Sequence, residues 1–278
     1  MKRKRVLVVT GPTASGKSAL AVNLAKEYGC DVISADSRQI FSGIPIVTAQ
    51  PTEEEREGVC HHLIGQLPLD SYYSASEFEL DALRLINLQF ETSDTAIVCG
   101  GSMLYVDALC NGIDDIPTIP EEFRNELKHS FEENGEEWLL GHLRLLDPET
   151  YLRIDRKNLK RVFHAVEVSL YAGHPYSSFL TGRKKPRPFE IEKKIIEHPR
   201  DVLFDRINRR VDKMIEMGLE EEALSVHHLK GLNSLNTVGL KEMFAYFEGN
   251  LDRVTAIERI KKNTRVFAKK QLTWLARK

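Results

Sequence analysis

The sequence has few of the features that mark a membrane protein or a disulfide-stabilised one. Among its 278 residues are four cysteines and two tryptophans, and no apolar run approaches the ~20 residues that a membrane span requires. No two cysteines stand in a CxxC pair, which argues against a zinc knuckle or a dithiol redox motif. We therefore expect Cys30, Cys60, Cys99 and Cys110 to be buried free thiols.

Net charge is also small, because 39 Lys and Arg residues face 41 Asp and Glu residues, which leaves −2. The distribution is uneven: residues 253–278 hold nine basic residues and one Glu, a local net of +8. The total charge therefore says little about nucleic acid, whereas the basic C-terminal stretch allows a polyanionic partner or a simple solvated face. The basic N-terminus precedes only a short apolar run ending in a glycine loop, so we expect a cytoplasmic protein without a signal peptide.

Apolar runs that alternate with amphipathic segments predict a parallel α/β sheet. The predicted strands are Arg5–Thr10, Asp31–Ser34, Thr95–Cys99 and Ile191–Glu197. The predicted helices around them are Lys17–Tyr28, a helix from the Ser74 or Ser76 capping box to Phe90, Arg200–Met217, Leu219–Leu229, Val238–Phe247 and Arg253–Arg277. We expect residues 1–116 and 189–278 to form a P-loop-type parallel sheet core flanked by helices.

Between these two parts the pattern changes to one without a convincing strand. Helices are predicted near Glu121–Glu133, Glu136–Leu146 and Asn158–Tyr171, and Thr181–Pro188 has the composition of a linker. Residues 117–188 are therefore expected to form an all-helical insertion domain.

A phosphate-binding loop follows the first predicted strand. The segment GPTASGKS matches GxxxxGK[ST] and opens a helix, which is the context this motif requires. Backbone N–H groups of such a loop converge on an anion, and the helix N-terminus adds partial positive charge. Lys17 can bridge terminal phosphate oxygens and Ser18 can bind Mg²⁺. The predicted diphosphate site consists of Gly11, Pro12, Thr13, Ala14, Ser15, Gly16, Lys17 and Ser18.

This motif does not name a reaction. Nucleotide-hydrolysing enzymes usually add an acidic residue after a second apolar strand to hold Mg²⁺, but the strand Thr95–Cys99 ends in two glycines. The comparable acid is Asp36, which could be a metal ligand, a helix cap or a general base. The strand Thr95–Cys99 is followed by Gly100, Gly101 and Ser102. These residues should lie at the carboxyl ends of the strands, as Asp36 does, and open α/β sheets bind their ligands there.

Other polar residues allow more than one interpretation. Arg206 and Arg210 share one face of a predicted helix and could clamp a diphosphate, or they could be a solvated surface. His61 and His62 are adjacent, so their side chains diverge, which argues against a shared metal ion.

The order of the motifs resembles the tRNA dimethylallyltransferase family (tRNA isopentenyltransferases) over nearly the whole chain. The matching blocks are GPTASGKS, SADSRQIFSGIPIVTAQP, GGSMLYVDAL, IPTIPEEFR, DRKNLKRVFHAVEVSLYAGHP, RINRRVDKMIEMGLEEEA, VGLKEMFAYFEG and NTRVFAKKQLTWLARK. Each block alone is weak, and their shared order makes the match specific.

The resemblance implies transfer of the dimethylallyl group from dimethylallyl diphosphate to N6 of adenine 37 in the anticodon stem-loop of a tRNA. It implies Asp36 as general base, Ser102 as a second catalytic position, and Mg²⁺ at Ser18 with Arg210 on the diphosphate. The implied tRNA contacts are Asp36, Ser37, Arg38, Gln39, Ser102, Arg124, Lys160, Arg161, Val162, Phe163 and His164.

Three alternatives remain open at this point. The phosphate loop alone also fits an ATP-dependent small-molecule phosphotransferase. A prenyltransferase acting on free AMP or ADP would share the same loop, although the basic segments favour a polymer. A non-enzymatic RNA-binding role leaves the phosphate loop unexplained. Nothing in the sequence demands a dimer, so a monomer is expected.

Overall fold

The computed structural model describes residues 3–277 of the chain and divides them into two compact units. One unit joins the residues up to Asn111 with those from Pro186 onward, and the other is Gly112–Lys185. The elements of the first unit are β1 (Arg5–Thr10), α1 (Lys17–Tyr28), β2 (Val32–Ser34), α2 (Pro45–Thr48), α3 (Glu53–Arg56), β3 (His61–His62), α4 (Ala75–Thr92), β4 (Thr95–Cys99), α5 (Met103–Asn111), β5 (Glu190–Ile195), α10 (Arg200–Glu216), α11 (Leu219–Ser225), α12 (Leu240–Phe247) and α13 (Arg253–Leu275).

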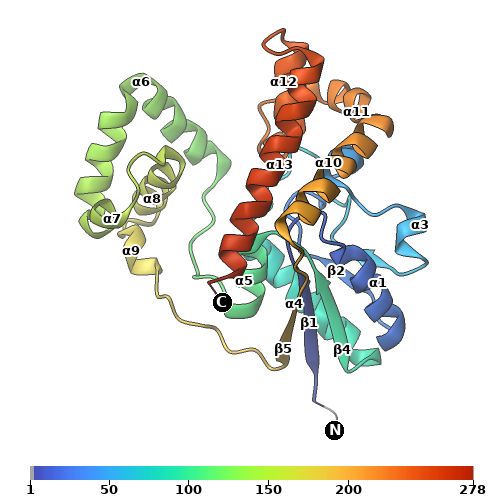
Figure 1. The fold of residues 1–278 in the computed structure, drawn as a ribbon. Coiled ribbons are helices and arrows are strands. Elements are labelled where there is room, and N and C mark those ends of the chain that lie inside the picture. The colour runs from blue at the N-terminus through green and yellow to red at the C-terminus, as the bar shows by residue number, and fades with distance from the viewer. Residues whose placement is uncertain (1–2, 278) are drawn as a thin grey trace. The chain divides into compact units, whose positions relative to one another are not determined.

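All strands of the first unit run parallel in one sheet with the order β3-β2-β4-β1-β5 (Figure 1). The central strand β4 pairs Val98 with Val8 of β1 on one side and with Ile33 of β2 on the other. Non-neighbouring strands in the chain are therefore neighbours in the sheet, as helical crossovers require. The predicted α/β class is confirmed.

The inner strands β1, β2 and β4 are buried on both faces of the sheet. Leu7 and Val9 of β1 pack with Ile97 of β4 against Ala21 and Ala25 of α1. Val6 and Val8, which alternate with them and point to the opposite face, are equally buried, and α4 packs against β4. Burial on both faces explains why these strands read as continuous apolar runs in the sequence.

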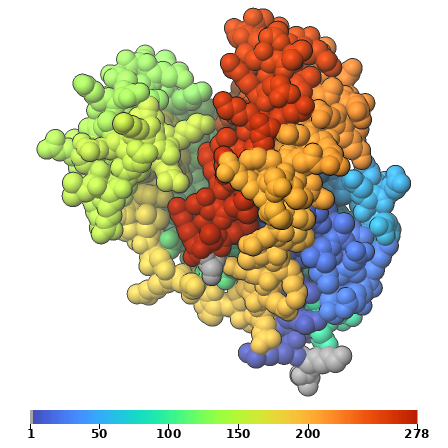
Figure 2. Space-filling model, in the orientation of Figure 1, coloured from blue at the N-terminus to red at the C-terminus, as the bar shows by residue number. Residues whose placement is uncertain are grey.

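The C-terminal helices complete this unit. Leu203 and Ile207 of α10 pack against Ala268 of α13, and Figure 2 shows the two helices, in orange and red, side by side on the surface. The indole N–H of Trp274 donates a hydrogen bond of 2.7 Å to Asp107 of α5. Helix α13 is thereby attached to the helix that follows β4.

The second unit is entirely helical. It contains α6 (Glu121–Leu146), α7 (Pro148–Arg153), α8 (Leu159–Ala172) and α9 (Tyr176–Phe179). Its core is formed by Leu139 and Leu143 of α6 with Val162 and Val166 of α8. The two helices expected on either side of Gly135 are confirmed, because Gly135, with φ 79° and ψ −171°, is not helical and divides α6 into two helical segments. The expected insertion ran from 117 to 188, whereas this unit runs from 112 to 185.

Several short elements were not predicted. Strand β3 has two residues and α2 and α3 have four each, which is too few for a period to be visible. Helix α5, of nine residues, was not predicted either. The expectation of buried cysteines is confirmed for Cys99 and wrong for Cys60, which is exposed, while Cys30 and Cys110 are only partly buried. None of the helices in residues 3–277 combines the length and apolar character needed to cross a bilayer.

Candidate active site

Three loops meet where the strands end. Val9 of β1 and Ser34 of β2 both pair with Cys99 of β4, so the segments that follow these residues emerge side by side. They border a cavity of about 370 Å³ within the first unit. The sequence-predicted site residues that line it are Thr13, Lys17, Ser18, Asp36, Ser37, Arg38, Gln39, Ser102 and Arg210. The structure thus brings two predicted groups, the phosphate loop and the Asp36 segment, to one cavity.

The phosphate loop contains residues with positive φ and is held by hydrogen bonds. Gly16 at the start of α1 has φ +90°, and Ala14 has φ +63°, a region that residues with a side chain seldom adopt. The N–H of Ser15 donates to the carbonyl of Pro12 at 3.2 Å. From outside the loop, His198 Nε2 donates to the Ser15 carbonyl and Arg206 Nε donates to the Ala14 carbonyl. Arg206 therefore stabilises the loop through its backbone and does not line the cavity.

Two basic side chains contribute to the wall of the cavity. Lys17 and Arg210 both line it. Burial, reinforced by the neighbouring Arg210, lowers the pKa of Lys17 from its ordinary value, while Cys99 and Asp36 oppose the change. Burial likewise lowers the pKa of Arg210, against the attraction of Asp36. Two cations that are destabilised by partial burial favour an anionic ligand between them.

Asp36 serves as a local cap and lines the cavity as well. Its Oδ1 accepts the backbone N–H of Arg38 at 3.0 Å and that of Gln39 at 3.4 Å. No residue in the described part of the chain donates a hydrogen bond to Oδ2. Ser102 stabilises the same turn, since its Oγ accepts the N–H of Ser37 at 2.8 Å and donates to the Ser37 hydroxyl at 3.2 Å. One carboxylate oxygen of Asp36 is thus structural and the other is available to a ligand.

Gln39 and Arg38 anchor this segment to its surroundings. The Gln39 amide N–H group donates to the carbonyls of Thr48 and Ala49, and its oxygen accepts the Ser34 hydroxyl. The Arg38 guanidinium donates to the carbonyl of Asn233 at 2.7 Å. Both residues line the cavity, and their hydrogen bonds to neighbouring segments stabilise its wall.

Gln271 on α13 is a site residue that sequence reasoning missed. Its Oε1 accepts the N–H of Thr13 at 2.8 Å, and its Nε2 donates to the carbonyl of Gly101 at 2.8 Å. A Cβ on Gly101 would lie 2.5 Å from that Nε2, and one on Gly100 would lie 2.1 Å from the Ala35 carbonyl. The glycine pair therefore exists for close packing. Nothing in the spacing of the C-terminal helix marks Gln271, because its role depends on which loops the helix reaches.

The other lining residues that were not predicted include His61, Thr48 and the segment 236–239. They come from β3, α2 and the approach to α12, so only the folded topology gathers them.

The predicted contacts in the second unit have mixed surroundings. Lys160 and Arg161 are exposed, whereas Val162 is wholly buried in the core, so its side chain does not face a ligand. Phe163 packs on that core. Arg124 Nε lies 2.9 Å and His164 Nδ1 2.8 Å from the buried carboxylate of Glu167. Although burial opposes it, these two hydrogen bonds lower the pKa of Glu167. The bond from Arg124 also ties α6 to α8.

Comparison with known proteins identifies the family. Residues 39–278 match the family described as IPP transferase. The chain belongs to the IPP transferase family. A relative called tRNA dimethylallyltransferase 2, from Parabacteroides distasonis, is 48% identical over 272 residues, which covers 98% of this chain and 91% of the relative. The resemblance drawn from the sequence motifs is confirmed.

Solved IPP transferase structures agree with the fold. The tRNA isopentenylpyrophosphate transferase of Bacillus halodurans is 36% identical with a TM-score of 0.69, and covers all of this chain and 88% of that one. A eukaryotic dimethylallyltransferase, described as acting on tRNA, is 26% identical with a TM-score of 0.83 and covers 98% and 70% of the two chains. The structure is therefore that of a transferase in the IPP transferase family.

Proposed function

We propose that this chain transfers the dimethylallyl group of dimethylallyl diphosphate to N6 of adenine 37 in tRNA. The product is N6-isopentenyladenosine, and diphosphate is released. The observation that carries this proposal is the single cavity in which a phosphate loop faces Asp36. A donor held by the loop presents its allylic carbon toward the side where Asp36 lies.

The phosphate end of the cavity holds the leaving group. Lys17 and Arg210 supply charge-assisted hydrogen bonds to diphosphate oxygens. The Ser15 hydroxyl is buried without a hydrogen-bond partner among the described residues, which fits a loop built around an acceptor-rich anion.

The Ser18 hydroxyl, an oxygen donor that lines the cavity, suits Mg²⁺ together with diphosphate oxygens. The ion would offset negative charge on the departing diphosphate.

Asp36 takes the proton at the acceptor end. The adenine N6 forms a bond to the allylic carbon as the bond from that carbon to the diphosphate oxygen breaks. An exocyclic adenine amine is a weak nucleophile, so a carboxylate placed to receive its proton lowers the barrier. Oδ2 is the oxygen for this task, since Oδ1 already accepts two backbone N–H groups. Ser37, Arg38, Gln39 and Ser102 shape the wall around the base.

The acceptor is a polymer in this proposal. A base must leave its stack to enter an enclosed cavity, and a single-stranded loop offers such a base at least cost. Lys160 and Arg161, exposed on α8, supply backbone contacts to the anticodon stem-loop. Since nothing in the sequence demands a dimer, we propose a monomer, and a tRNA substrate fits a cytoplasmic location.

Nucleoside mass spectrometry tests the proposal. The protein is incubated with Mg²⁺, dimethylallyl diphosphate and an unmodified tRNA with adenine at position 37, and the tRNA is digested. We expect adenosine heavier by one five-carbon unit, and none when the diphosphate is omitted.

Parallel incubations separate the alternatives. If free AMP is modified as readily as tRNA, the acceptor is a free nucleotide and not tRNA. If phosphate passes from ATP to a small molecule and no prenylated product forms, the protein is a phosphotransferase and not a prenyltransferase. No product on a tRNA that a known active enzyme modifies would overturn the proposal.

A further inference from the structure

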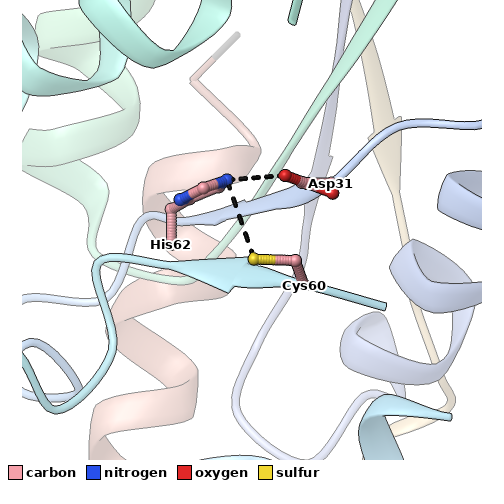
Figure 3. A group of neighbouring side chains, drawn as sticks. All are labelled: Asp31, Cys60 and His62. Carbon is pink, nitrogen blue, oxygen red and sulfur yellow. Dashed lines mark hydrogen bonds and ion pairs between the residues drawn. The ribbon is translucent and has the colours of Figure 1, made fainter. Parts of the chain in front are cut away.

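Three side chains of types that ligate metals meet near the start of β2, whereas Asp36 follows the end of that strand. Asp31 immediately precedes β2, Cys60 immediately precedes β3, and His62 is the second residue of β3. Figure 3 shows the His62 imidazole directed at both the Asp31 carboxylate and the Cys60 thiol. Ser34 ends β2, and Asp36 follows it, so the cluster and the catalytic carboxylate lie at different ends of the strand.

The sheet register fixes these three positions. Val32 pairs with His61, and the Val32 N–H donates to the carbonyl of Cys60 at 2.9 Å. Asp31 and Cys60 therefore enter neighbouring strands together. Since side chains alternate along a strand, Cys60 and His62 share one face while His61 points to the other, where it lines the cavity. Backbone pairing, and not a loose loop, brings the donors together.

The donor atoms converge closely enough for a single ion. His62 Nε2 lies 2.8 Å from Asp31 Oδ2 and 3.9 Å from Cys60 Sγ, and all three donor atoms lie within 4.8 Å of one another. A tetrahedral zinc ion with bonds of about 2.0 Å to nitrogen and about 2.3 Å to sulfur needs donors roughly 3.3–3.8 Å apart. Side-chain shifts of less than about 1 Å produce that arrangement.

The donor set matches a thiophilic divalent cation. Imidazole, thiolate and carboxylate are the three ligand types that zinc takes in proteins. A carboxylate and a thiolate together balance the two charges of the ion, and the thiol proton passes to solvent on binding. Cys60 is exposed, and Asp31 and His62 are partly exposed, so an ion has access and a water molecule can complete the tetrahedron.

We propose that Asp31, Cys60 and His62 form a binding site for one zinc-class divalent cation. The ion cross-links β2 to the two-residue edge strand β3 and closes the chain segment between them, which carries Asp36. It also braces the strand whose other face presents His61 to the cavity. The proposal stands independently of the prenyl-transfer function.

Cobalt titration of the full chain, freed of metal with a chelator, tests the site. Co²⁺ serves as the probe because a thiolate ligand gives a charge-transfer absorption and tetrahedral coordination gives intense visible bands. We expect one equivalent to bind with both signatures and Zn²⁺ to displace it. Cys60→Ser should abolish the charge-transfer band and weaken binding at least about tenfold.

Cys110→Ser is the matched control, since it removes a half-buried thiol of α5 that lies outside the cluster. It should leave the titration unchanged. His62→Asn provides a second variant, in case Cys60→Ser is unstable, and should weaken binding to a similar extent. The proposal is overturned if the wild-type chain binds no stoichiometric Co²⁺, or if the charge-transfer band persists in Cys60→Ser.

Discussion

Individual residues in the cavity carry both structural and chemical duties. Asp36 spends Oδ1 on the turn that it caps and leaves Oδ2 for a ligand. Of the three roles that the sequence allowed, a metal ligand, a cap and a general base, the structure shows the cap, and the role of base stays a proposal. The sequence could predict the residue because an acid after a strand faces the binding edge of the sheet. It could not predict the division between the two oxygens.

Lys17 gives a pH prediction at this scale. In the proposed reaction diphosphate binds the protonated ammonium group, and burial lowers the pKa of Lys17 below its ordinary 10.5. The ammonium therefore loses its proton at a lower pH than a free lysine does, so affinity for inorganic pyrophosphate should fall as pH rises, beginning below 10.5. Lys17→Met should weaken binding about 10- to 100-fold near neutral pH and remove this pH-dependent step.

Calorimetric titration with pyrophosphate from about pH 7 to about pH 10 measures both effects. Between the lowered pKa of Lys17 in the folded protein and its ordinary 10.5, the unfolded chain holds more protons at this residue than the folded chain does. The free energy of unfolding of the ligand-free protein therefore rises with pH in that window. A pH profile in Lys17→Met identical to that of the wild type would contradict this assignment.

At the scale of elements, long periodic segments could be predicted and short ones could not. The strand Arg5–Thr10 and the helix Lys17–Tyr28 were predicted at their observed bounds, because buried strands and capped helices leave strong local patterns. Strand β3 exists only because it pairs with β2. Val162 is part of a motif block but is buried, which only the packing of α8 on α6 decides.

Gln271 shows what a distant element contributes to the cavity. Because its buried amide joins Thr13 to Gly101, Gln271→Leu leaves an N–H and a carbonyl unsatisfied. We expect a loss of about 1–3 kcal/mol in the free energy of unfolding and a slower transfer step, since both loops loosen. Urea denaturation and single-turnover kinetics measure the two effects.

Thr273→Ala on the exposed face of the same helix is the control for this prediction. It should change the free energy of unfolding by no more than about 0.5 kcal/mol. If Gln271→Leu behaves like Thr273→Ala in both measurements, the hydrogen bonds of Gln271 to Thr13 and Gly101 contribute neither to stability nor to the transfer step.

The whole molecule consists of a catalytic unit with its own cavity and a helical unit with its own core. The change in sequence pattern after Gly112 predicted this division, because one part alternates strands with helices and the other has no strand. The near-neutral total charge concealed the local basic surfaces. What each unit does must therefore be tested with charge changes confined to one of them.

Salt dependence tests the second unit. The double variant Lys160→Ala and Arg161→Ala should weaken tRNA binding and reduce the slope of log affinity against log salt by about two, one per lost phosphate contact. Filter binding at several sodium chloride concentrations measures the slope. Lys128→Ala, an exposed lysine of α6, is the control and should leave the slope unchanged. An unaltered slope in the double variant would remove α8 from the tRNA interface.

The account as a whole depends on Asp36 acting as the base in the cavity that holds the donor. The most direct test is the single-turnover rate of dimethylallyl transfer to tRNA in Asp36→Asn. Asparagine keeps an oxygen for the N–H groups of Arg38 and Gln39 but is a far weaker base. We expect a rate about 10²- to 10⁴-fold lower, with pyrophosphate affinity undiminished. A rate within about threefold of the wild type, in a folded variant, would contradict the account.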